Sequence, residues 1–363
     1  MTDKLFVDIH VIQTVPPSCL NRDDTGSPKT AIYGGVQRAR VSSQSWKRAI
    51  REMFKENLDE SEVGTRTKKI VDMVAERIIA KSENTYEDAI SLAEEIIKLA
   101  NIIKIDDTDV KALFFMSSSQ ADNLAELALS KGKLDKKAVQ AVLNSGHGID
   151  IALFGRMVAN DPSLNADASA QVAHAISTHR VNIEYDYFTA VDDRSPEDNA
   201  GAGMIGTIEF DSATLYRYAT VAVHDLYDHL AKDAPATTRA IIEFIRAFIT
   251  SMPTGKQNTF ANRTPADAVL VCLRKDQPLN LVGAYEEAVK LKADDSGYVK
   301  TSIAKLADYY KKIISDFACA PEKCWGIGSD FSGLIEPLDL TSMLSVISST
   351  IQLDTDSLVR TED

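Results

Sequence analysis

Residues 5 to 13 read L-F-V-D-I-H-V-I-Q, and this stretch provides the first element of the fold. Its apolar residues alternate along the chain and fall on one side: Leu5, Val7, Ile9 and Val11. Alternation of this kind predicts a β-strand with one face in the core. The next periodic segment begins only at Ser43, a predicted helix N-cap. Apolar residues then recur at the spacing of one helix face: Trp46, Ala49, Ile50, Met53 and Phe54. A strand followed by an amphipathic helix indicates a mixed α and β domain.

The middle of the chain, from about residue 58 to 145, has a wholly helical pattern. Apolar residues recur at helical spacing in three segments, 70–79, 89–103 and 110–129. We therefore predict a helical subdomain over 58–145, inserted into a main domain formed by residues 1–57 and 146–363.

The remainder of the main domain mixes strands and helices. A short strand is expected at 149–157 and an alanine-rich helix at 166–179. Two strand-like runs, 181–191 and 207–223, flank a glycine-rich tip and predict a long hairpin. A helix, a strand and two more helices follow, at 234–251, 267–273, 279–292 and 299–317. In order, these elements give the split β-α-β-β-α-β pattern of the α+β, ferredoxin-like class, which RNA-recognition-motif cores share.

Charge is segregated along the chain. Between Arg22 and Arg51 there are seven Lys or Arg and two Asp, a local charge of +5 in a chain whose formal net charge is -13. Phosphate affinity depends on local cations rather than on the total charge. Lys47, Arg51 and Lys55 share one face of the predicted helix. A single cation of this kind is more often an ordinary solvated residue, but the whole set predicts a grip for a phosphate backbone.

Two loops have compositions that suit nucleic-acid binding. Nearly thirty residues separate the first strand from Ser43, which is too long for an ordinary connection, so we predict a binding loop there. The segment 251–266 has two cations, no acid and many amide and hydroxyl groups. Such side chains suit phosphate and ribose contacts, although an ordinary polar loop has the same composition.

Composition argues against a membrane protein and against a disulfide framework. No apolar run reaches the roughly 18 residues of a membrane span, and the chain opens without the features of a signal peptide. The four cysteines are scattered. We expect a cytoplasmic protein. The acidic total argues against nonspecific duplex DNA binding, but it permits a basic groove that holds one strand.

Motifs for catalysis and metal binding are missing. The sequence lacks the P-loop, the dinucleotide fingerprint, the nucleophile elbow and the zinc-protease motif. His174 and His179 are five residues apart, which does not place them on one helix face. Cys319 and Cys324 make only a weak metal clip. We predict no cofactor and no metal site.

Several long segments resemble the CasC-type backbone subunit of the type I-E CRISPR Cascade complex. They read S-C-L-N-R-D-D, A-I-Y-G-G-V-Q-R-A-R-V-S-S-Q-S-W-K-R-A, G-I-D-I-A-L-F-G-R-M, A-H-A-I-S-T-H-R-V, Y-F-T-A-V-D-D, G-T-I-E-F and Y-R-Y-A. The resemblance implies a hand-like protein with an RNA-recognition-motif palm, helical fingers from the insertion and a β-hairpin thumb at about 187–219. It implies that copies stack head to tail along one CRISPR RNA, with other Cascade subunits and target DNA as further partners and no membrane.

The resemblance also implies roles for individual residues. The expected RNA-backbone grip comprises Arg22, Lys29, Arg38, Arg40, Ser42, Gln44, Lys47, Arg48 and Arg51. Residues expected to kink the RNA and displace one base at intervals are Met157, Phe188, Thr189 and Ile205. Lys256 and Asn258 are added from similar loop character.

Two functions from different classes follow from these expectations. The first is a noncatalytic scaffold that holds sugar and phosphate and leaves guide bases free for pairing. The second is a metal-dependent RNA-cleaving backbone subunit, as in type III effector complexes, in which Asp23 or Asp24 assists a metal ion. Adjacent acids in loops, here Asp23–Asp24 and Asp192–Asp193, more often serve turns or pair with a neighbouring arginine.

Overall fold

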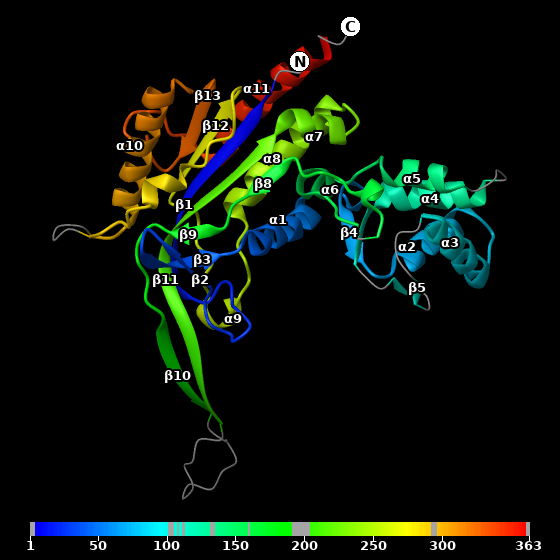
Figure 1. Ribbon diagram of the computed structural model, residues 1–363, viewed down its shortest axis with the longest axis horizontal. Helices are drawn as coiled ribbons and strands as arrows, with labels where there is room; N and C mark the ends of the chain where they lie inside the picture. Colours follow the sequence, from blue (N-terminus) through cyan, green and yellow to red (C-terminus); the bar gives the residue numbers. More distant parts are fainter. Residues whose placement is uncertain are drawn as a thin grey trace, which may run out of the picture.

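The computed structural model describes residues 4–100, 105–106, 109–110, 113–130, 135–158, 160–190, 204–291 and 296–360. A large antiparallel sheet dominates it, with the strand order β13-β12-β1-β11-β9-β3-β2 (Figure 1). At its centre β1 (Phe6–Ser18) pairs with β11 (Met204–Ala222) and with β12 (Ala268–Arg274). The outer strands are β2 (Thr30–Tyr33), β3 (Val36–Val41), β8 (Ala170–Val172), β9 (Ala175–Ser177) and β13 (Lys323–Ile327).

The predicted fold class is confirmed by this topology. Along the chain, β1 leads to helix α1 (Ser43–Asn57), then to β8 and β9, then to β11, helix α8 (Ala234–Thr250) and β12. Both β8 and β9 pair with β11, so the four strand positions lie in the order 4-1-3-2 of a ferredoxin-like sheet. We call this sheet and its helices the palm.

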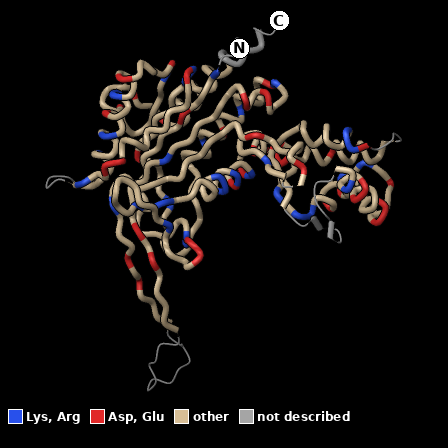
Figure 2. The backbone as a smooth tube through the Cα atoms, viewed as in Figure 1, with Lys and Arg blue, Asp and Glu red and all other residues tan. Residues whose placement is uncertain are grey.

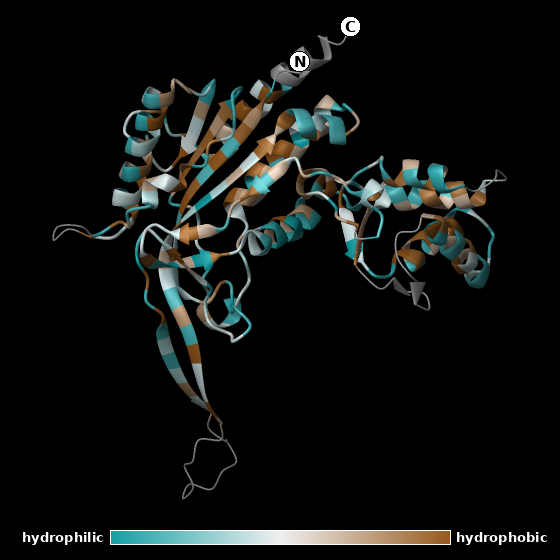
Figure 3. Cartoon of the chain, viewed as in Figure 1, coloured by the Kyte–Doolittle hydropathy of each residue, from teal (hydrophilic) through white to brown (hydrophobic). Residues whose placement is uncertain are grey.

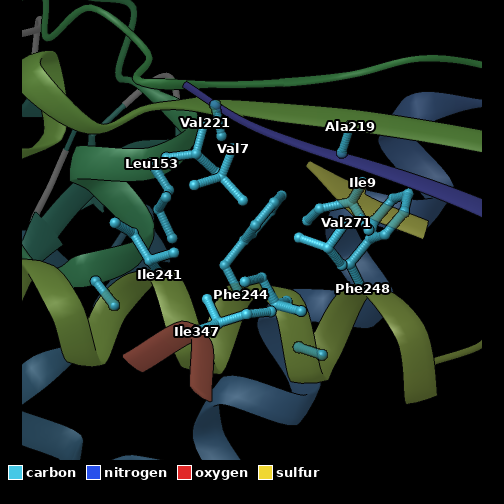
Figure 4. Packing of buried hydrophobic residues seen from close by; sticks show 14 of the residues in the cluster. Val7, Ile9, Leu153, Ala219, Val221, Ile241, Phe244, Phe248, Val271 and Ile347 are labelled. Carbon is cyan, nitrogen blue, oxygen red and sulfur yellow. The ribbon is translucent and has the colours of Figure 1, made fainter. Parts of the chain in front are cut away.

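Apolar residues fill both faces of the sheet. On one face, Val7 and Ile9 of β1 pack with Phe244 and Phe248 of α8 and with Ile347 of α11 (Leu340–Arg360) (Figure 4). The opposite face is covered by η3 (Leu281–Tyr285) and α10 (Val299–Phe317). Figure 3 shows hydrophobic colour through the strands and α8, whereas the visible surface of α1 is largely hydrophilic.

The inserted segment forms a separate lobe with its own core, the fingers (Figure 1). Its helices are α2 (Ile70–Lys81), α3 (Tyr86–Ala100), α4 (Ser118–Leu129) and α5 (Lys136–Leu143). The prediction that this segment is wholly helical is wrong. Two strand pairs lie between the helices, β4 (Gly64–Thr67) with β7 (Phe114–Ser117) and β5 (Ile105–Asp106) with β6 (Asp109–Val110).

Two further element predictions are wrong in the palm. The expected strand at 149–157 is helix α6 (Ile149–Phe154), because a short apolar run does not distinguish the two structures. The expected alanine-rich helix at 166–179 contains β8 and β9 instead. Helix propensity differs by only about 0.7 kcal/mol per residue among ordinary residues, so sheet pairing outweighs it here.

The predicted long loop before α1 is partly regular. Strand β1 extends to Ser18, and β2 and β3 form a hairpin before the helix. The N-cap is Ser42 rather than Ser43, since the Ser42 side chain accepts a hydrogen bond from the Ser45 N–H. The region predicted as a helix at 279–292 has just the short η3 among its described residues, 279–291.

The long hairpin is present. Strand β10 (Glu184–Ala190) pairs with the first residues of β11 and extends away from the sheet (Figure 1). The predicted glycine-rich tip lies outside the described residues. Shorter elements are η1 (Glu60–Glu62), η2 (Pro162–Leu164), α7 (Val223–His229) and α9 (Gln257–Phe260). Among the described residues, no helix combines the length and apolarity needed to cross a membrane.

Candidate nucleic-acid interface

A groove with a volume of about 840 Å³ lies beside α1. One flank of α1 and the segments 20–26 and 251–257 line it, together with Asn262 and Arg263. The groove brings together three of the predicted cations, Arg22, Arg48 and Lys256. None of these three has an acidic partner within 4 Å in the described part of the chain. Four acids, Asp23, Asp24, Glu52 and Glu56, also line the groove, so its cations are local features and not part of a uniformly basic surface.

Close backbone packing holds the two loops of the groove together. A Cβ atom on Gly255 would lie 2.1 Å from the carbonyl oxygen of Leu20, so only glycine permits this approach. Asn21 connects the first loop to α1, because its side-chain oxygen accepts from the Ser42 N–H at 2.9 Å. Lys256 has a left-handed backbone with a φ of 52° at the start of α9. The predicted residue Asn258 is exposed on α9 and does not line the groove.

Asp23 forms the turn of the first loop. Its Oδ1 accepts hydrogen bonds from the Thr25 N–H at 2.9 Å, the Thr25 hydroxyl at 2.7 Å and the Ser27 N–H at 3.0 Å. The bond from Thr25 is the main cause of a lowered pKa of Asp23. Asp24 is exposed beside it. Within the described residues there is no cluster of three or more His, Cys, Asp or Glu that could hold a metal ion.

A second group of cations lies at the N-terminus of α1. Lys29 and Arg40 are half-buried and lie close enough to His174 to lower its pKa, although burial is the larger cause. His174 Nδ1 accepts from the Ser43 N–H at 3.3 Å. The predicted residue Gln44 is exposed at the same helix end. Sequence reasoning did not select His174, and the only available signal was its position in one of the motifs that resemble the family.

Arg38 differs from the other predicted grip residues. It is fully buried, and its guanidinium donates to the carbonyl oxygens of Tyr33, Ser177, Tyr285 and Glu286 at 2.8–3.3 Å. Its donors are therefore directed at backbone carbonyls inside the protein. The structure does not place Arg38 with the exposed cations, and it gives this residue a structural role.

Lys47 and Arg51 lie on another flank of α1, facing α6 and the fingers. Lys47 Nζ is 5.5 Å from the ring centre of Phe154, and burial lowers the pKa of Lys47. Arg51 Nε is 3.0 Å from a carboxylate oxygen of Asp150, and the Arg51 side chain is only 15% exposed. Asp150 also accepts from the Gly64 N–H at 2.7 Å. The Arg51 guanidinium also donates to the Gly64 carbonyl oxygen at 3.3 Å, so Arg51 and Asp150 together join the palm to the base of the fingers. The neighbouring cation Lys55 pairs with Glu52 at 3.2 Å.

The residues predicted to kink RNA lie on separate elements. Met157 follows α6 and is 87% exposed. On the hairpin, Phe188 is half-buried and faces Gly206, where a Cβ atom would lie 2.4 Å from its ring. Thr189 is paired with Ile205, and both are exposed.

The hairpin has two exposed aromatic residues that sequence reasoning missed. Tyr185 and Tyr187 alternate with acidic residues on β10 and are each 67% exposed. The sequence could have indicated them, because two residues that are two positions apart in a strand lie on the same face. Figure 2 shows mainly acidic positions along the hairpin, in contrast to the cations along α1.

Cys319 and Cys324, which the sequence analysis set aside as a metal clip, have separate contacts. Cys319 Sγ lies 3.6 Å from the carbonyl oxygen of Ile313, whereas Cys324 Sγ lies 2.8 Å from Cys272 Sγ on the adjacent strand. Both of these contacts are within the palm and away from α1.

The chain is similar over nearly its whole length to chains of solved structures. A family model described as "CT1975-like protein" matches residues 7–334. A solved structure titled "CRISPR RNA-guided surveillance complex, pre-nicking" contains a chain 32% identical to this one, with a TM-score of 0.81. That match covers 94% of this chain and 100% of the other. A chain of a second structure, titled "CRISPR RNA-guided surveillance complex", is 29% identical with a TM-score of 0.69, and the match covers 94% and 99% of the two chains. No match was found among curated proteins.

Proposed function

Because this chain belongs to the family of CT1975-like proteins, we propose that it is a CRISPR RNA-binding backbone subunit of a Cascade surveillance complex. In the finer form of this proposal the complex is of type I-E, the chain is not an enzyme, and copies of it associate head to tail along the guide RNA in the cytoplasm. The guide is presented for pairing with target DNA. Similarity over nearly the whole length of chains from RNA-guided surveillance complexes supports the assignment.

The observation that carries the proposal is the set of unpaired cations around α1. Arg22, Arg48 and Lys256 line a groove without acidic partners in the described residues, in a chain with a formal net charge of -13. Phosphates respond to local cations, so these three can hold a strand although the chain as a whole is acidic. Contacts from such cations to phosphates carry no sequence information. Bases of the bound strand would remain free to pair, as a guide requires.

The hairpin supports the assembly part of the proposal. It extends from the palm (Figure 1), and its Tyr185, Tyr187 and Ile205 are large apolar or aromatic side chains that the described residues leave exposed. Contact between unlike surfaces of successive copies builds an open helix, so the RNA would set the length of the filament.

The RNA-cleaving alternative depends on Asp23 or Asp24. The hydrogen bonds that Asp23 accepts from its own turn support a structural role for this residue. Incubating RNA-loaded protein with complementary RNA and Mg²⁺ tests the alternative. Regularly spaced products that disappear in Asp23→Ala or Asp24→Ala would replace the noncatalytic proposal.

RNA retention tests the proposed function directly. The full-length protein is co-expressed with a CRISPR RNA and purified, and its ultraviolet absorbance ratio is measured before and after ribonuclease. We expect bound RNA in the wild type and a large loss in Arg22→Glu with Arg48→Glu. A charge-matched control is Lys300→Glu with Lys312→Glu on exposed positions of α10. RNA retained equally by both variants would contradict the proposal.

A further inference from the structure

The cations on α1 continue onto the fingers. The Arg51 guanidinium lies 4.4 Å from the ring centre of Phe115 on β7. The guanidinium of Arg66 on β4 lies 5.0 Å from the centre of the same ring. Arg66 and Phe115 are directly opposite each other in the β4–β7 pair, so their side chains lie on one face of that pair. Phe115 is thus a shared platform for one palm cation and one fingers cation.

Only one of these two arginines has a counterion. Asp150 is 2% exposed, and its carboxylate is bonded to Arg51 and to the Gly64 N–H. Arg66 is exposed and has no acidic partner within 4 Å in the described residues. Partial burial, and next the nearby charge of Arg51, lower the pKa of Arg66, whereas the more weakly acting charge of Asp150 raises it. Neighbouring like charges repel, so an anion bound beside Arg66 would be stabilised by both guanidinium groups.

More cations follow Arg66 along the chain. Residues 65–69 read T-R-T-K-K, with three cations and no acid, and Lys68 and Lys69 are both exposed. Neither lysine forms an ion pair within the described residues. Figure 2 shows Lys and Arg positions both on α1 and at the end of the fingers nearest to it. The shared contact with Phe115 places this segment next to Arg51 on α1.

We propose that Arg66, Lys68 and Lys69 bind the phosphodiester backbone of a nucleic-acid strand and extend the α1 surface onto the fingers. In this arrangement Phe115 is a positioning residue, because the Arg66 guanidinium packs against its ring at the junction with Arg51. The inference rests on the proposed function. The phosphodiesters belong either to the guide RNA or to the DNA strand that pairs with it, and the experiment separates these two sources.

The test compares two charge-matched variants of the full-length protein co-expressed with a CRISPR RNA. One is Arg66→Glu with Lys68→Glu, and the other is Lys300→Glu with Lys312→Glu on α10, which Figure 1 shows on the side of the sheet away from the fingers. Retained RNA is quantified first. Fluorescent complementary DNA is then titrated into the RNA-loaded protein at several salt concentrations. Lys68→Glu with Lys69→Glu repeats the test at two exposed positions that follow β4.

Each outcome decides between the possibilities. Lower RNA retention than in the control would assign the surface to the guide. Normal RNA retention together with at least about a tenfold loss in DNA affinity would assign it to the DNA strand. The slope of log affinity against log salt concentration should then also fall by about 0.7 for each phosphate contact that is lost. RNA retention and DNA affinity equal to those of the control would overturn the inference while leaving the proposed function intact. A wild-type protein without RNA would overturn both.

Discussion

The guanidinium of Arg38 donates to the carbonyl oxygen of Tyr285 at 2.8 Å, which joins β3 to a segment 247 residues later in the chain. A second bond, to the carbonyl oxygen of Ser177 at 2.9 Å, ties the same guanidinium to β9. Arg38 therefore connects three segments at one end of the sheet. This position explains why an arginine in a cationic loop stabilises the fold and is not free to hold a phosphate.

Replacing Arg38 and Arg48 should separate stability from RNA binding. Arg38→Ala leaves several buried carbonyl groups without donors, so we expect the free energy of unfolding to fall by about 3 kcal/mol or more. Arg48→Ala removes an exposed side chain and should change it by less than about 0.5 kcal/mol, while lowering RNA affinity. Urea unfolding and titration with labelled RNA measure the two effects. A stable Arg38→Ala protein with lost RNA binding would show that Arg38 contacts RNA directly.

Asp150 is expected to be essential for the joint between palm and fingers. Asp150→Ala removes the carboxylate from the partly buried Arg51 and from the Gly64 N–H. Breaking a buried pair on one side costs about 3–5 kcal/mol. The double variant Asp150→Ala with Arg51→Met should recover part of that loss, because no unpaired charge remains. Urea denaturation of the wild type, Asp150→Ala, Arg51→Met and the double variant gives the coupling energy between the two residues. Additive losses of unfolding free energy would show that Asp150 and Arg51 do not stabilise each other.

Much of the palm could be predicted because its signals are local. The alternation of residues 5–13 and the helical stripe that begins at Trp46 both correspond to regular elements with a buried face. Strands β8 and β9 escaped prediction because their alanines favour helix locally, and only pairing with the distant β11 decides their structure.

The candidate site was predictable as a set of cations but not residue by residue. Arg38 and Arg40 stand two positions apart on β3, yet one is fully buried and the other is half-buried near solvent. The partners of Arg38 are far away in sequence, so no local pattern identifies it as a structural residue. Arg66 was missed for the same reason, because its link to Arg51 passes through Phe115.

We expect the burial of His10 to make the protein less stable in acid. It is 2% exposed, its Nδ1 lies 2.9 Å from the Tyr216 hydroxyl, and burial is the main cause of a pKa lowered from 6.5 to about 3. The unfolded chain takes up a proton below pH 6.5 while the folded protein does not. Stability from this group is therefore present above pH 6.5 and is lost as the pH falls toward 3.

The measurement for His10 is the change in unfolding free energy between pH 7 and pH 5. We expect His10 alone to lower the unfolding free energy by about 2 kcal/mol between pH 7 and pH 5. The pKa of Asp8, which burial raises to about 6, gives a smaller change of opposite sign. Because Asp8 is present in both proteins, His10→Gln should lose about 2 kcal/mol less than the wild type. Equal losses would show that His10 is protonated in the folded protein.

The hairpin offers a test of assembly that leaves the palm intact. A Cβ atom on Gly206 would lie 2.4 Å from the Phe188 ring, so Gly206→Val must displace this ring. The hairpin extends from the sheet, and we therefore expect little change in the cooperative unfolding of the palm. Association of several copies on one RNA should weaken, which sedimentation velocity with RNA in excess over protein measures. In Gly206→Ala with Phe188→Ala the steric conflict is relieved but the ring is lost. We expect this double variant to assemble as poorly as Gly206→Val, because the Phe188 ring is missing. Restored assembly would show that the backbone of the hairpin matters and the ring does not.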